Sequence, residues 1–131
     1  MEHTQKHSAK REAILACIRG TDSHPSADWV YQQLKPRIPG LSLATVYRNL
    51  TLFRSQGLIA SVGTVRGLER FDGNPKPHVH FVCEGCGAVM DLPGIILPGS
   101  LAAEAECSLS CSVKATSLSF SGLCAQCKKE N

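Results

Sequence analysis

The stretch HVHFVCEGCG, residues 78–87, contains two kinds of metal ligand side by side: a pair of histidines and a C-x-x-C unit formed by Cys83 and Cys86. A second C-x-x-C unit, Cys124 and Cys127, stands close to the carboxyl end of the chain. Each short turn can point two thiolates at one ion, so the two units predict a tetrahedral zinc site. Four protein ligands leave no open position, which predicts a structural zinc. Disulfides or a redox-active C-x-x-C remain the alternatives.

The two histidines of this stretch predict a second metal site. In a strand, residues i and i+2 point to the same side, so His78 and His80 would present two imidazoles together. A chain reversal at residues 83–87 would bring Asp91 roughly opposite the pair, and Asp72 lies just upstream. Two imidazoles with one or two carboxylates suit Fe(II), Mn(II) or Zn(II). We therefore expect one permanent ion and one exchangeable ion.

The sequence around these ligands predicts a small α/β unit. We expect strands at residues 78–82, 88–92 and 112–123, a loop at 93–99, a short helix at 101–107 and a solvated tail at 128–131. Cys107 ends the expected helix, and Cys111 follows it closely. They are expected to be buried thiols, with an auxiliary redox or metal pair as the alternative.

The first half of the chain predicts three helices followed by a β-hairpin. We expect helices at residues 8–19, 27–35 and 43–56, and strands at residues 58–62 and 68–72 around a glycine-rich turn at 63–67. Ser26 and Ser42 are good N-caps, and Gly20 and Gly57 are typical helix stops. This order of elements is typical of a winged helix-turn-helix, in which the third helix enters the DNA major groove.

The outer face of the third helix carries the candidate DNA-binding side chains. These polar, aromatic and cationic residues are Thr45, Tyr47, Arg48, Asn49 and Thr51. Such a face fits a recognition helix, because an arginine there can make a bidentate contact with guanine. A three-helix domain with a merely solvated face is the alternative that the pattern leaves open.

Composition and charge divide the chain into two modules. We expect a DNA-binding domain at residues 1–72, a hinge at residues 73–77 that contains two prolines, and an α/β domain at residues 78–131. Residues 1–71 carry ten Lys or Arg against five Asp or Glu, whereas the remainder carries four against six. Only the first module is therefore suited to a polyanion, although its excess of positive charge is modest.

The bulk properties indicate a soluble, cytoplasmic protein that does not enter a membrane. The chain has 131 residues, with no apolar run of about 18 residues and no apolar core of a signal peptide at the amino end. In a reducing compartment cysteines bind metal more often than they form disulfides. This supports the zinc interpretation of the two C-x-x-C units.

Five motifs, in this order, resemble the ferric uptake regulator family of bacterial metal-dependent repressors. They are HPSAD (residues 24–28), ATVYRNL (44–50), ERFD (69–72), HVHFVCEGCG (78–87) and GLCAQC (122–127). The resemblance covers residues 8–128. It implies an α+β fold with an N-terminal winged helix-turn-helix and a small C-terminal α/β dimerisation domain.

The resemblance also implies the ligands of the regulatory site and how it works. Those ligands would be His24, Asp72, His78, His80 and Asp91, and His24 cannot be found from spacing alone. An ion held from both sides of the hinge would select one relative placement of the two winged helices. A homodimer would then bind a pseudo-palindromic operator in double-stranded DNA.

Within the family, Asp91 together with His24 resembles the peroxide-responsive regulators. That implies Fe2+ or Mn2+ as the regulatory ion, beside the structural Zn2+, and oxidation of His24 or His78 when iron is bound. Arg48 instead resembles the iron-responsive regulators.

We therefore expect a metal-dependent homodimeric repressor that senses peroxide and is not an enzyme. An iron- or zinc-uptake regulator of the same family is the first alternative. A small non-haem metalloenzyme and a zinc-stapled interaction module without a DNA role are the others.

Overall fold

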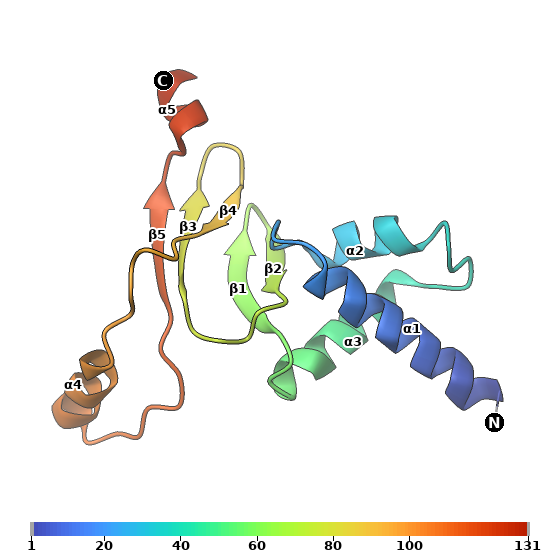
Figure 1. Ribbon diagram of the computed structural model, residues 1–131, viewed down its shortest axis with the longest axis horizontal. Coiled ribbons are helices and arrows are strands. Elements are labelled where there is room, and N and C mark those ends of the chain that lie inside the picture. Colours follow the sequence, from blue (N-terminus) through green and yellow to red (C-terminus); the bar gives the residue numbers. More distant parts are fainter. Residues whose placement is uncertain (1, 131) are drawn as a thin grey trace. The chain divides into compact units, whose positions relative to one another are not determined.

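The computed structural model describes the backbone of residues 2–130 and the side chains of residues 9–130. The chain divides into two compact units, and the division falls between Pro75 and Lys76. Figure 1 shows the helices and strands of both units in chain order. Among the described residues, no helix is long and apolar enough to cross a lipid bilayer.

The N-terminal unit begins with three helices, as expected. These are α1 (Glu2–Arg19), α2 (Ala27–Leu34) and α3 (Leu43–Ser55). The hydroxyl of Ser26 accepts a hydrogen bond from the Trp29 amide at 3.2 Å, and that of Ser42 accepts one from the Thr45 amide at 3.1 Å. Both N-caps therefore satisfy amide groups that a helix start leaves open. The helices enclose a core of fully buried aliphatic and aromatic side chains, including Ile14, Ile18, Val30, Leu34, Val46, Leu50 and Phe53.

The wing of this unit is a two-stranded antiparallel hairpin of β1 (Ala60–Val65) and β2 (Leu68–Asp72). The predicted turn at residues 63–67 was too long, because the observed turn contains only Arg66 and Gly67. Both have positive φ, 52° and 85°, which matches the twist of a tight hairpin. Gly63 instead lies inside β1, where the register shifts between Ser61 and Gly63, as in a β-bulge.

The C-terminal unit is built on a three-stranded sheet in the order β4-β3-β5. Its elements are β3 (Val79–Cys83), β4 (Val89–Asp91), α4 (Ser100–Leu109), β5 (Leu118–Gly122) and α5 (Ala125–Glu130). β4 runs antiparallel to β3 and β5 runs parallel to it (Figure 1). The fold class predicted from the sequence, α+β with a winged helix followed by a small α/β unit, is confirmed.

The last strand of this unit was predicted too long. The last strand covers only residues 118–122 of the expected 112–123. The segment before it is held to α4 instead of the sheet, because the Val113 amide donates to Glu106 Oε2 at 3.0 Å. Residues 128–130 are exposed, as expected for a solvated tail, and they belong to the helix α5, in which the Lys128 amide donates a hydrogen bond to the Cys124 carbonyl at 2.8 Å. Asn131 lies outside the described residues.

Cys107 and Cys111 were expected to be buried, and both are exposed. The reason is that α4 buries none of its residues against the rest of its unit. The Cys111 thiol instead lies 3.6 Å from the carbonyl of Ala105, at the end of the helix.

The C-terminal unit has little hydrophobic core of its own. Its buried hydrophobic residues are Val79, Cys83 and Val89. An apolar row crosses the sheet instead, because Phe81 pairs with Met90 on one side and with Phe120 on the other. Met90 is 40% exposed and Phe120 is 44% exposed. So small a core depends on additional stabilisation, which a structural metal or a second subunit can supply.

Candidate metal centres

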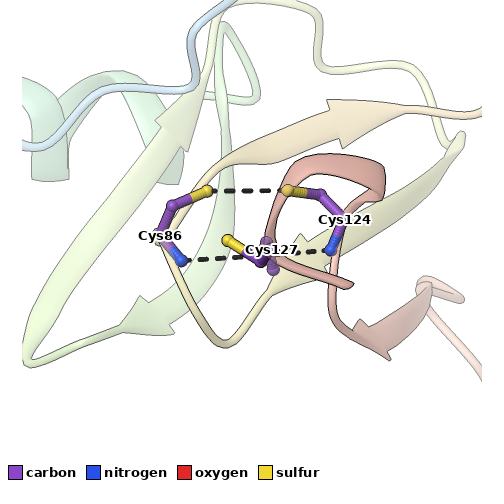
Figure 2. A group of neighbouring side chains, drawn as sticks. Cys86, Cys124 and Cys127 are labelled. Carbon is purple, nitrogen blue, oxygen red and sulfur yellow. Dashed lines mark hydrogen bonds between the residues drawn. The ribbon is translucent and has the colours of Figure 1, made fainter. Parts of the chain in front are cut away.

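The four thiols of the two C-x-x-C units meet at one edge of the C-terminal sheet. β3 and β5 are parallel, with Cys83 opposite Gly122, so their carboxyl ends lie together. Cys83 and Cys86 stand at the end of β3, and Cys124 and Cys127 follow β5. The four Sγ atoms lie within 4.8 Å of one another. Figure 2 shows the sulfur atoms of Cys86, Cys124 and Cys127 turned toward one another.

Two glycines allow the first C-x-x-C turn to close. Gly87 has a φ of 79° and donates its amide to the Cys83 carbonyl at 2.9 Å. A Cβ added at Gly85 would lie 2.9 Å from the Sγ of Cys127, which is too close for a carbon–sulfur contact. A side chain at Gly85 would therefore push the second thiol pair away from the first.

The spacing of the thiols fits a zinc ion. Cys86 Sγ and Cys124 Sγ are 3.9 Å apart, and a tetrahedral ion with Zn–S bonds of about 2.3 Å separates its ligands by about 3.8 Å. Two amides, those of Cys86 and Cys124, also point at the Cys83 sulfur from 3.4 and 3.3 Å. Backbone donors of this kind stabilise a thiolate ligand.

Electrostatics inside the cluster favour binding of a cation. The Cys86 amide, followed by that of Cys124, lowers the pKa of the Cys83 thiol to about 6. A hydrogen bond with Cys83, followed by one with Cys124, raises the pKa of Cys127 to about 12. Four thiols this close cannot all ionise without a counter-ion, so metal binding must displace protons. Affinity for the metal therefore falls as the pH falls.

A second cluster lies on one face of the same sheet and contains His78, His80 and Asp91. Asp91 on β4 stands directly opposite His80 on β3. One carboxylate oxygen, Asp91 Oδ1, lies 3.1 Å from His78 Nε2 and 3.3 Å from His80 Nε2. The two imidazole rings are close as well, with their centroids 4.3 Å apart. Three donor atoms thus converge on one point.

The tautomer of His78 follows from its second contact. Its Nδ1 lies 2.6 Å from the Lys76 carbonyl, and a carbonyl can only accept, so Nδ1 carries the proton. In the neutral ring Nε2 then presents a lone pair toward the Asp91 carboxylate. Two such acceptors face each other only across a proton or a metal ion. The nitrogen and oxygen donors of this cluster fit a borderline divalent ion.

The remaining two predicted ligands form a pair inside the N-terminal unit. His24 Nε2 lies 3.2 Å from Asp72 Oδ2, and both side chains are buried, at 2% and 9% exposure. Asp72 ends β2, and its other oxygen, Oδ1, accepts a hydrogen bond from the Asn74 amide at 2.9 Å. The carboxylate is thus held in place by the chain that follows the strand. Each unit therefore contains a preformed group of nitrogen and oxygen ligands.

Arg70, whose role no sequence motif indicated, holds the loop that carries His24. Its guanidinium donates to the His24 carbonyl and, at 2.9 Å, to the Ser23 carbonyl. Partial burial lowers the pKa of Arg70, although a guanidinium stays protonated at neutral pH. Its position in the sequence could have indicated this role. Arg70 stands two residues before Asp72, and alternate residues of a strand point to the same side.

The candidate DNA-binding residues lie along one side of α3. Tyr47, Arg48 and Thr51 are exposed, and Thr45 and Asn49 are half-buried. Three of them are joined along the helix: the Arg48 guanidinium donates to the Thr45 hydroxyl at 3.1 Å, and the side-chain Nδ2 of Asn49 donates to the Thr45 carbonyl at 2.8 Å. Tyr47, Arg48 and Thr51 line a shallow hollow with Leu52 and Ser55. This side of the helix is therefore open to a partner.

A winged helix-turn-helix followed by a unit with a four-thiol cluster and a histidine–carboxylate cluster defines a DNA-binding fold with side chains that could hold metal ions. Residues 2–98 match the ferric uptake regulator family. The chain belongs to the ferric uptake regulator family, whose members are DNA-binding transcription regulators that act as dimers.

The chain is similar to two curated relatives whose names refer to peroxide. It is 37% identical to the peroxide operon regulator of Bacillus subtilis over 125 residues, 93% of this chain and 84% of the relative. It is 39% identical to the peroxide-responsive repressor PerR of Staphylococcus epidermidis over 82 residues, 63% of this chain. That second match spans about half, 55%, of the relative's length.

Solved structures agree with this assignment. The peroxide stress regulator of Campylobacter jejuni superposes with a TM-score of 0.78 at 27% identity, covering 96% of this chain and 94% of that one. The ferric uptake regulator of Francisella tularensis, solved with iron, gives a TM-score of 0.70 at 26% identity, covering 90% of both chains. The fold is therefore shared with a peroxide stress regulator and with a ferric uptake regulator.

Proposed function

We propose that this chain is a metal-dependent, homodimeric transcriptional repressor of the cytoplasm that responds to peroxide. The observation that carries the proposal is the convergence of His78 Nε2 and His80 Nε2 on one oxygen of Asp91, at 3.1 and 3.3 Å. Such a cluster, on a winged-helix protein, is suited to an exchangeable regulatory ion. The similarity to two relatives whose names refer to peroxide supports the sensing role.

In this proposal one Fe2+ or Mn2+ ion is held by ligands from both units. His24 and Asp72 would provide one side of the site, and His78, His80 and Asp91 the other. The support is that each group is already assembled within its own unit, with a nitrogen-to-oxygen distance of 3.2 Å in the first. A structural Zn2+ would occupy the four-thiol cluster, where it would stabilise the small core of the second unit.

Such a site would couple metal binding to DNA binding. Ligands on both sides of the hinge can all reach one ion only in a limited set of arrangements of the two units, so the ion favours those arrangements. The coupling is reciprocal, so operator DNA would also tighten metal binding. In the dimer, the two α3 helices would then be spaced to enter successive major grooves of a pseudo-palindromic site.

The proposed contacts with DNA come from Thr45, Tyr47, Arg48, Asn49 and Thr51. Arg48 is the candidate for base recognition, since it is exposed and can approach a guanine edge with two donors. The short hydroxyl and amide groups are suited to phosphate contacts, which position the helix without reading sequence.

The proposed response to peroxide is oxidation of a ligand. Iron bound in the site would supply the redox chemistry that activates peroxide. In the net reaction the imidazole of His24 or His78 gains one oxygen atom from hydrogen peroxide, and the other oxygen leaves as water. An oxidised imidazole no longer offers the same lone pair in the same direction. The remaining ligands would then hold the ion less tightly, and repression would end.

The apolar row on the C-terminal sheet is our candidate for the dimer surface. Phe81, Met90 and Phe120 lie side by side across three strands. His80 and Asp91 occupy the opposite face, because neighbouring residues of a strand alternate. Dimerisation through the apolar face would therefore leave the metal ligands accessible to the N-terminal unit.

One experiment tests the proposed function directly. A binding sequence would first be selected from random double-stranded DNA with the Mn2+-loaded protein. Affinity for that DNA would then be measured with Mn2+, with a chelator, and with Fe2+ before and after peroxide. We expect binding that requires metal and that peroxide abolishes only in the iron form. Equal affinity with and without chelator would contradict the proposal.

The exposed Arg48 favours a second candidate, an iron-uptake regulator, because an arginine at this position resembles the iron-responsive members of the family. That protein would show the same dependence on metal but would keep its DNA affinity after peroxide. The iron-loaded arm of the experiment therefore separates the two.

A further inference from the structure

We propose that Arg70 is a positioning residue for the regulatory metal site, because it fixes the backbone of His24 in the conformation that brings the imidazole to Asp72. The inference rests on the proposed function, in which His24 and Asp72 are metal ligands. It adds a residue that binds no metal itself and acts through the loop that carries a ligand.

Arg70 makes two contacts with consecutive residues of that loop. Its Nε donates to the carbonyl of His24, and a terminal nitrogen donates to the carbonyl of Ser23 at 2.9 Å. A guanidinium is planar, so its donors form a fork of fixed geometry, and little freedom is lost for each bond formed. The two carbonyls are thereby held in one orientation relative to β2.

The conformation of His24 explains why it needs to be held. Its φ is 53°, in the left-handed region that residues other than glycine seldom occupy. The next residue is Pro25, and a residue before proline favours extended backbone. Such a conformation persists only where its surroundings impose it. The contacts of Arg70 are one such constraint.

The strand β2 also carries the other contacts that hold the loop of His24. Arg70 and Asp72 are two residues apart in the strand, so their side chains leave it on the same side. Asp72 lies 3.2 Å from the His24 ring, while the amide of Phe71 between them donates to the Pro25 carbonyl at 2.9 Å. One short strand therefore holds both the backbone and the ring of His24, and releasing the backbone would move the ring.

The first test measures Mn2+ affinity of the zinc-loaded, full-length protein, using the electron paramagnetic resonance signal of free Mn2+. We expect Arg70→Met to weaken binding roughly 10- to 100-fold, as loss of an outer partner does at other metal sites. Arg70→Lys, which keeps the charge and can reach one carbonyl, should recover part of the affinity. The matched control is Arg54→Met, which removes an arginine bound to the neighbouring Glu69 at 2.7 Å and should leave the affinity unchanged.

The second test needs no regulatory metal. Hydrogen exchange of the Phe71 amide reports on its bond to Pro25, so it should accelerate in Arg70→Met and not in Arg54→Met. If Arg70→Met fails to fold, as judged by its melting curve, Arg70→Lys and Arg70→Gln carry both measurements.

The possible outcomes separate this inference from the function on which it rests. A His24→Ala variant that binds Mn2+ as tightly as the native protein would overturn the metal site and, with it, the role of Arg70. Weakened binding in His24→Ala with native affinity in Arg70→Met would overturn the role of Arg70 alone.

Discussion

His24 and Asp72 are far apart in the sequence, yet the imidazole Nε2 of one lies 3.2 Å from the carboxylate Oδ2 of the other, and both are buried. Neither side chain belongs to the hydrophobic core of the unit, which is formed by other residues. A small substitution at His24 can therefore remove a proposed ligand while leaving the fold in place.

We predict that His24→Ala lowers affinity for operator DNA at least tenfold in the presence of Mn2+, because the ion would lose one of its two proposed ligands from the N-terminal unit and with it much of the coupling between metal and DNA. Affinity would be measured by fluorescence anisotropy, with circular dichroism as the check on folding. Asp22→Ala, an exposed residue of the same turn, is the matched control. Native DNA affinity in His24→Ala would rule out the proposal that an ion held by ligands from both units controls DNA binding.

We predict that Cys127→Ser abolishes zinc retention and destabilises the C-terminal unit, because metal binding contributes to the folding free energy of a small unit. Zinc content would be measured by elemental mass spectrometry and stability by thermal melting. Cys107→Ser removes an exposed thiol outside the cluster and should behave as the native protein does. An unchanged zinc content and melting curve in Cys127→Ser would refute the structural zinc.

We predict that Arg48→Ala weakens operator binding by about 1–3 kcal/mol, the range for loss of one bidentate base contact. Loss of specificity should accompany the loss of affinity. Replacing the guanine that Arg48 contacts should therefore not change the affinity of the variant for the operator. Lys114→Ala removes one exposed positive charge from the C-terminal unit and serves as the control. Equal losses in both variants would indicate a general charge effect instead of base recognition.

We predict that a low dose of peroxide adds 16 Da to a peptide containing His24 or His78 in the Fe2+-loaded protein and not in the Mn2+-loaded protein. The mass corresponds to one oxygen atom gained by the imidazole, and Mn2+ does not supply the same redox chemistry. Mass spectrometry of tryptic peptides would locate the modification. Unmodified histidines together with retained DNA binding would favour the iron-uptake alternative.

We predict that Phe120→Lys converts the dimer to a monomer at micromolar concentration, because it places a charge within the apolar row, beside Phe81. Sedimentation velocity would measure the change. Phe120→Leu keeps an apolar side chain and should remain dimeric. A dimeric Phe120→Lys variant would place the interface elsewhere, and the exposed helix α4 would be the next surface to test.

Local chemistry explains which features could be predicted from the sequence. Ser26 and Ser42 were recognised as N-caps because capping depends on residues only three positions away, and both bonds are present. The opposition of His80 and Asp91 followed from strand alternation and one tight reversal. Membership of the ferric uptake regulator family was predicted from five motifs and is confirmed.

Features that depend on contacts between distant segments were predicted poorly. The length of β5 depends on β3, its pairing partner, and the segment before it binds Glu106 instead. Cys107 was expected to be buried, but none of the residues of α4 is buried. The hairpin turn was placed too early because Gly63 forms a bulge and not a turn.

By itself, the sequence determined the ligand types, their local spacing, the caps of the helices and the family of the protein, since all of these reside in short motifs. Only the tertiary structure decided which distant ligands meet. The parallel register of β3 and β5 brings the two C-x-x-C units to one edge, and β2 brings Arg70 and Asp72 to His24. The reason is physical: local periodicity fixes where a side chain points within its own element, whereas contacts between elements depend on how the whole unit packs.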